Sequence, residues 1–186
     1  MLHTIRTSRD LPPAIQDPVD LLLACHARLR HFSELSLALA TRTDLDDAQV
    51  RDASHRLLRY FRVALPLHEA DEEETLAPAL APVMTPELAD AALQMRDQHR
   101  LLHDVLAELL PQWSLAEAEP GLVDRAAMAP HARRLAAILD VHLALEETTI
   151  FPTARSLPDR ERARLFAEMR ARRSDEVMAE MKTIAG

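Results

Sequence analysis

Apolar residues recur every three or four positions along most of this chain, and prolines divide that pattern into long segments. The widest proline-free gaps cover residues 19–65, 87–110, 131–151 and 159–186. Spacings of three and four place apolar side chains on one face of an α-helix. Because proline ends or kinks a helix, these gaps are where long helices can run.

Five helices are expected from this pattern, over residues of about 17–41, 45–80, 85–111, 123–154 and 158–182. Pro66 is expected to kink the second helix just before His68, and the third is expected to end near Pro111. Four long helices with short connections predict an antiparallel four-helix bundle, with the fifth packed on it or extending from it. The expected divisions are an N-terminal extension, the bundle and a C-terminal helix, over residues 1–16, 17–155 and 156–186.

Composition supports an all-α fold. Hydrophobic residues make up 48% of the chain but aromatic residues only 3%, so the apolar mass is mostly Leu, Ala and Val. Leu and Ala are among the strongest helix formers. The chain has two glycines, whereas an all-β protein needs many more for its turns.

Charge and cysteine content limit the binding partners and the cellular compartment to be expected. A formal net charge of −8 argues against non-specific nucleic-acid binding, which needs a basic surface. No apolar run approaches the length of a membrane span, and the first residues lack the apolar core of a signal peptide. Cys25 is the single cysteine and is expected to be a small core residue. We therefore expect a cytoplasmic protein that binds neither nucleic acid nor membrane.

Two distant stretches of the chain are nearly alike. Residues 68–78 read HEADEEETLAP and residues 142–152 read HLALEETTIFP. Each begins with His, has Glu-Glu at the fifth and sixth places, Thr at the eighth and Pro at the eleventh. A His and a Glu four residues apart on a helix point in nearly the same direction, about 6 Å apart along the axis. The second glutamate of each stretch points about 140° away and is expected to face water or a helix flank. These second glutamates are Glu73 and Glu147.

Every expected bundle helix places a histidine in its apolar stripe. One such histidine is more often an ordinary core residue, but four helices that repeat the feature favour a shared cause. Burying several imidazoles and carboxylates without compensation would cost several kcal/mol per charge, and a metal centre supplies that compensation. Seven side chains exceed one tetrahedral site and suit two metals bridged by both carboxylates. The candidate ligands are His26, His68, Glu72, His99, His103, His142 and Glu146. Imidazole with carboxylate suits iron best, with manganese or zinc as substitutes.

At these residues the sequence resembles the hemerythrin family, in its broad bacterial HHE cation-binding form. The matching elements are His26, H-E-A-D-E from His68, H-R-L-L-H from His99 and H-L-A-L-E from His142. The resemblance implies a four-helix bundle that holds a non-haem di-iron centre with an oxo or hydroxo bridge. It implies His26 and His68 on one iron, His99, His103 and His142 on the other, and both glutamates as bridges. Oxygen-carrying members have Asp five residues after the last histidine, where this chain has Glu147. The helical angle favours Glu146 instead.

The function implied by this resemblance is the binding of a diatomic ligand, O2 or NO, at the iron with fewer histidines. Oxygen or NO sensing, carriage and stress-related iron handling all fit such a site. The alternatives are a di-iron enzyme that repairs damage or handles peroxide or NO, and a bundle with a purely structural metal. No nucleophile or general base is evident, which favours a binding protein over an enzyme. The ferritin-like Glu-x-x-His motif is absent. The sequence leaves a homodimer open and names no protein partner.

Overall fold

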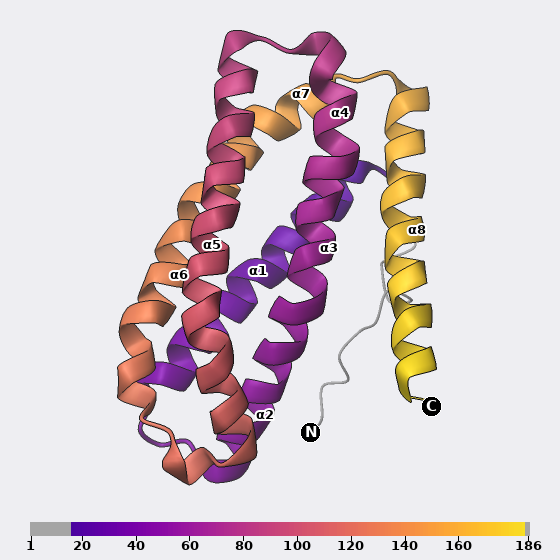
Figure 1. The fold of residues 1–186 in the computed structure, drawn as a ribbon. Helices are drawn as coiled ribbons and strands as arrows, with labels where there is room; N and C mark the ends of the chain where they lie inside the picture. The colour runs from indigo at the N-terminus through magenta and orange to yellow at the C-terminus, as the bar shows by residue number, and fades with distance from the viewer. Residues whose placement is uncertain (1–15, 185–186) are drawn as a thin grey trace.

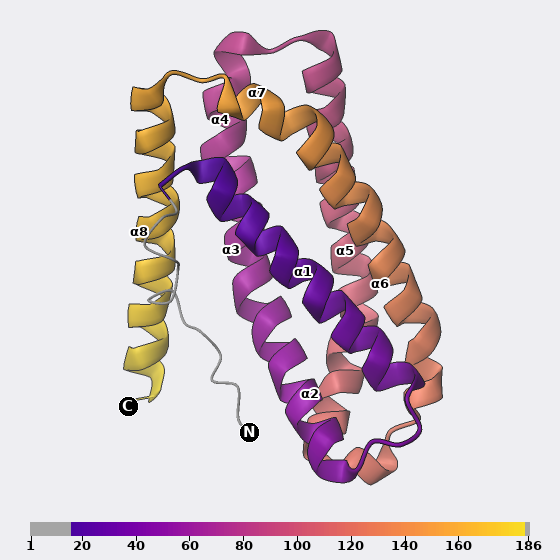
Figure 2. The same cartoon turned by 180° about the vertical axis from the view of Figure 1, so that it is seen from behind.

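The computed structural model describes the backbone of residues 16–184 and the side chains of residues 16–174. The predicted N-terminal extension lies outside it, apart from its last residue. Four helical rods form an antiparallel bundle, and a fifth helix lies along its side (Figures 1 and 2). Between residues 16 and 184 there is no strand, and no helix is long and apolar enough to cross a membrane. The predicted all-α four-helix bundle with an extra C-terminal helix is confirmed.

The first rod is α1, Pro18–Thr41, and it begins where the Asp17 side chain accepts a hydrogen bond from the Val19 N–H at 2.9 Å. The second rod is continuous but changes helical type along its length. Its parts are α2 (Asp47–Arg59), a π-helical turn (Tyr60–Ala64), α3 (Leu65–Ala70), a second π turn (Asp71–Leu76), α4 (Ala77–Leu80) and a 3-10 turn (Ala81–Val83).

The third rod is α5, and the fourth is α6 continued by α7. Their bounds, with those of the short turns and the last helix, are α5 (Pro86–Ala118), a 3-10 turn (Pro120–Leu122), α6 (Arg125–Leu145), a π turn (Glu146–Ile150), α7 (Phe151–Arg155) and α8 (Asp159–Ile184). The expected end of the third helix at Pro111 was wrong. Pro111 sits on the exposed side of α5, while Leu109 and Trp113 are fully buried on its inner side. Their burial favours a helix that continues past the proline.

Within residues 16–184, each of the three π turns ends two residues before a proline. In each, the residue after the turn donates its N–H to the carbonyl five positions earlier, and the next residue is proline. The donors are Leu65, Ala77 and Phe151, and the prolines are Pro66, Pro78 and Pro152. Proline lacks an N–H, so the usual bond from its own position is missing in any case. The kink expected at Pro66 is therefore a π turn, and π turns are frequent at functional sites.

A polar layer divides the bundle core into two apolar clusters. The larger cluster lies between α1, α2, α5 and α6. The smaller cluster is formed by α4, α7, α8 and the first parts of α1 and α5. Along α1, for example, Leu29 belongs to the first cluster and Leu22 to the second, with buried His26 between them. The same order holds along α5, where His99 lies between Met95 and Leu102.

Helix α8 is fixed to the bundle by apolar and charged contacts. Leu165 and Met169 are fully buried in the smaller cluster. Arg172 and Arg173 both pair with Asp71, whose side chain is fully buried. A buried carboxylate needs such partners, because an unpaired charge in the core is costly.

Candidate metal centre

The polar layer contains four histidines and two glutamates, each at most 2% exposed. Every rod of the bundle contributes at least one of them. They are His26 on α1, His68 on α3, Glu72 in the following π turn, His99 on α5, His142 on α6 and Glu146 in the last π turn.

These six side chains form two overlapping groups. In each group the four potential ligand atoms lie within 4.8 Å of one another. One group contains His26 and His68, and the other contains the two remaining histidines. Glu72 and Glu146 belong to both. Two sites that share two carboxylates are the arrangement expected of a bridged pair of metal ions.

Each carboxylate faces one histidine from each group. The Glu72 Oε1 atom is 3.0 Å from His68 Nε2, and its Oε2 atom is 3.2 Å from His99 Nε2. The Glu146 Oε2 atom is 2.9 Å from His26 Nε2, and its Oε1 atom is 3.3 Å from His142 Nε2. The two oxygens of each glutamate thus point to different sites.

None of these eight inward atoms has a hydrogen bond, although the distances between them are short. Their angles do not suit a hydrogen bond, so buried nitrogen and oxygen atoms remain without a partner. Each such atom typically costs about 1–3 kcal/mol. Cations placed among them would satisfy all eight, and imidazole nitrogen with carboxylate oxygen is a donor set that suits iron, zinc or manganese. The residues present therefore fit a pair of metal ions.

The second glutamate of each repeated stretch supports a histidine from behind. His26 donates from Nδ1 to Glu147 Oε1 at 2.8 Å, and Arg30 donates to the same oxygen at 2.8 Å. His99 donates from Nδ1 to Glu73 Oε1 at 2.6 Å. The helical angle predicts that both glutamates face water or a helix flank, and it does not predict this role. At a flank position the long glutamate side chain can reach the next helix. Such outer partners fix the orientation of a metal-binding imidazole.

The other two histidines have different outer partners. The Nδ1 atom of His142 is 3.2 Å from the Gln98 Oε1 atom. His68 lies instead beside the thiol of Cys25. Burial by itself would raise the pKa of this thiol, but the contact with His68 and the charges of His68, Arg173 and Arg28 lower it to about 7. Cys25 is buried as expected, but it also belongs to a polar network.

The charges of the metal-free cluster are unevenly distributed. Burial lowers the pKa of His26 to about 4 and that of His142 to about 3. Burial would lower the pKa of His68 as well, but Glu72 outweighs it and raises that pKa well above its usual value. Burial and the negative charge of Glu72 raise the pKa of Glu146 well above its usual value. Burial would lower the pKa of His99 too, but its contacts with Glu72 and Glu73 outweigh burial and raise that pKa. His68, His99 and Glu146 are therefore the groups of the cluster that keep a proton to a higher pH than usual.

The structure brings together six of the seven predicted ligands, and His103 lies outside their cluster. Its side chain is 60% exposed, and its Nε2 atom is 2.8 Å from Glu69 Oε2. His103 does follow His99 by one turn, but α5 turns it outward past the edge of the core. The shared direction of residues four apart was therefore not sufficient to bring it into the site.

The fold and this cluster define a metal-binding helical bundle of a known family. The family model for the Hemerythrin HHE cation binding domain matches residues 17–154. The chain therefore belongs to that family, and the resemblance found in the sequence is confirmed. The match ends before α8, so α8 lies outside the shared domain.

A similar protein is found in Haemophilus influenzae (strain ATCC 51907 / DSM 11121 / KW20 / Rd). It bears the name "Uncharacterized protein" and is 31% identical over 91 residues. The match covers 47% of this chain and 52% of the relative, so this chain spans about half the length of the relative.

Proposed function

We propose that this protein holds two iron ions in the polar layer and uses them to bind a diatomic ligand, O2 or NO. The observation that carries the proposal is the pair of ligand groups that share both Glu72 and Glu146. A structural ion would need one closed set of about four ligands, whereas two shared carboxylates build a dinuclear site. Iron would supply the redox and ligand-binding chemistry there, with manganese or zinc as substitutes.

The four histidines of the polar layer would divide equally between the two ions. His26 and His68 would bind one ion, and His99 and His142 the other, with each carboxylate bound to both. His103 lies outside, so the predicted division into two and three histidines is replaced by two and two. Both ions would then have the same number of protein ligands, which leaves room for an external ligand at either one.

Apolar surroundings suit a binding role. The polar layer lies between two apolar clusters, which would keep water away from bound ions. Water exclusion strengthens the electrostatic interactions of the site and limits side reactions. Sensing, carriage and iron handling all use such a site, and we propose that the protein works in the reducing cytoplasm, where its single cysteine stays free.

Metal analysis and spectroscopy test the proposal. Protein made with iron should contain about two ions per chain, and its oxidised form should absorb in the near ultraviolet. The reduced form, mixed with O2 or NO without other reagents, should change its absorption. A protein with at most one ion per chain would contradict the dinuclear site. A protein with two ions that responds to neither gas would contradict the diatomic ligand.

A further inference from the structure

An apolar pocket leads from the surface of the bundle to the side chain of Glu72. It encloses about 290 Å³ of empty space, including its open mouth, between the end of the second rod and the start of α5. Eight of its nine lining residues are apolar, and the ninth is Glu72. Glu72 is one of the two carboxylates shared by both proposed metal sites.

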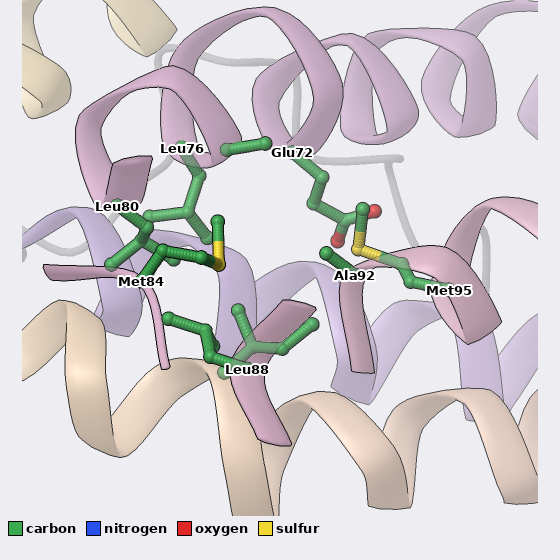
Figure 3. A pocket seen from close by; sticks show the side chains of 9 residues that line it. Glu72, Leu76, Leu80, Met84, Leu88, Ala92 and Met95 are labelled. Carbon is green, nitrogen blue, oxygen red and sulfur yellow. The ribbon is translucent and has the colours of Figure 1, made fainter. Parts of the chain in front are cut away.

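The two ends of the pocket differ in exposure. Glu72 and Met95 are at most 2% exposed, whereas Met84 is 42% exposed. Figure 3 shows Glu72 and Met95 at one end, with Leu80 and Met84 at the other. The pocket therefore begins at the connection between α4 and α5 and ends against the buried side chain of Glu72.

We propose that this pocket is the route by which a small uncharged diatomic molecule, O2 or NO, reaches the metal centre. The inference rests on the proposed function and adds the path and the residues that select the ligand. O2 and NO carry no charge and lose little hydration in an apolar passage. An anion or a hydrated ion would lose its water without gaining a hydrogen bond, at a cost of several kcal/mol.

The side of the centre where α8 packs has a different character. Arg173 pairs there with buried Asp71 and donates to the Cys25 sulfur at 3.4 Å, next to His68. Arg172 pairs with the same aspartate. This side is closed by a charged network, whereas the pocket is lined by methyl and thioether groups. An uncharged gas is therefore selected by the pocket side.

Xenon tests the pocket without any iron chemistry, because apolar cavities bind it. Xenon NMR on the full chain loaded with zinc should show binding that Ala92→Phe removes, since Ala92 lines the pocket. Ala107→Phe is the matched control, because Ala107 is exposed on the same helix and lies outside the pocket lining. A parent protein that does not bind xenon, or equal binding in Ala92→Phe, overturns the proposal.

Stopped-flow mixing of the reduced, iron-loaded protein with O2 or NO tests the route itself. Ala92→Phe should slow the reaction about tenfold, which equals about 1.4 kcal/mol of added barrier, with unchanged iron content. Met84→Trp should slow it in the same direction and serves if Ala92→Phe does not fold, because Met84 is exposed at the mouth. Ala107→Phe should react like the parent. Unchanged rates in folded, pocket-blocked variants overturn the route, whereas a parent that reacts with neither gas contradicts the proposed function instead.

Discussion

The two halves of the chain build the same constellation twice. In each half, a helix with one histidine of the cluster precedes a rod that carries His, Glu and Glu at fixed spacing. His68 follows His26 by 42 positions, and His142 follows His99 by 43. In both halves the first glutamate faces two Nε2 atoms, and the second accepts from an Nδ1 atom of the other half. The repeated stretch is thus a histidine, a shared carboxylate and a supporting carboxylate.

The halves differ only around this constellation. His68 has the Cys25 thiol and the nearby Arg173 guanidinium beside it, whereas His142 has the neutral amide of Gln98. Arg30 binds Glu147, whose side chain is 29% exposed, while that of Glu73 is 41% exposed. Four of the six cluster residues come from the repeated stretches, and His26 and His99 come from α1 and α5. The differing surroundings come from α1, α5 and α8. Two sites with equal sets of candidate ligands therefore differ in the charge and exposure of the residues around them.

The largest effect should come from removing a shared carboxylate. Glu72→Ala or Glu146→Ala should remove both ions, because each glutamate belongs to both ligand groups. The loss of affinity should exceed the roughly 10–100-fold that follows loss of an outer partner. Elemental analysis after dialysis against a chelator measures it. Glu74→Ala, on the same turn with a 69% exposed side chain, is the control and should keep both ions. Retention of one ion in either variant would show that the carboxylate is not shared.

Removing a supporting carboxylate should affect one half more than the other. Glu147→Gln weakens the support of His26, and Glu73→Gln weakens that of His99, so each should reduce the affinity of one ion by about 10–100-fold. Chelator competition that resolves two binding steps would show which ion is lost first. Equal weakening of both binding steps in both variants would contradict the prediction that each supporting glutamate acts mainly on one ion.

Much of the fold and of the inner site could be read from the sequence, because helix periodicity and four-residue spacing are local properties. His68 with Glu72 and His142 with Glu146 are fixed by the helix on which both members lie. Contacts between helices could not be predicted from such local spacing. The Nδ1 partners of His26 and His99 depend on how far a flanking glutamate reaches across to another rod, which four-residue spacing alone does not predict.

Two differences between the sequence prediction and the structure have the same origin. Local chemistry disfavours proline inside a helix and predicts an end at Pro111, but burial of Leu109 and Trp113 outweighs that preference. Four-residue spacing after His99 predicts that His103 faces the site, but in the structure His103 points toward Glu69. In both cases tertiary packing decides between locally equivalent possibilities. The run H-x-x-x-E-E, present in both stretches, was the available signal for the supporting glutamates.

Metal binding should release protons, and its pH dependence should have a definite sign. Burial disfavours a charged His68, but Glu72 outweighs it and raises the pKa of His68 in the metal-free protein. Burial and the charge of Glu72 likewise raise the pKa of Glu146. The contacts of His99 with Glu72 and Glu73 outweigh its burial and raise its pKa as well. These three groups keep their protons to a higher pH than usual and must lose them to bind a metal, so metal binding should release protons. Affinity should therefore rise with pH until it passes these three pKa values.

A pH indicator in weakly buffered solution measures this release during zinc titration. Glu146→Gln, which has no carboxyl proton to lose, should release less even where some metal still binds. His26 and His142 should contribute little, because burial keeps the pKa of each at about 4 or about 3 and both are already neutral. An affinity that stays constant between about pH 6 and pH 8 would contradict proton loss from His68, His99 and Glu146.

The smallest effect should come from His103→Ala, and it decides whether the two halves are equal. His103 is 60% exposed and pairs with Glu69 at the surface, so its loss removes no inward nitrogen. An exposed pair of this kind contributes at most about 1 kcal/mol to stability. Metal content and both binding steps should match those of the parent, whereas His99→Ala on the same helix should lose metal. If His103→Ala instead weakens one ion as much as His99→Ala does, then α5 rotates when metal binds, and one half has three histidines where the other has two.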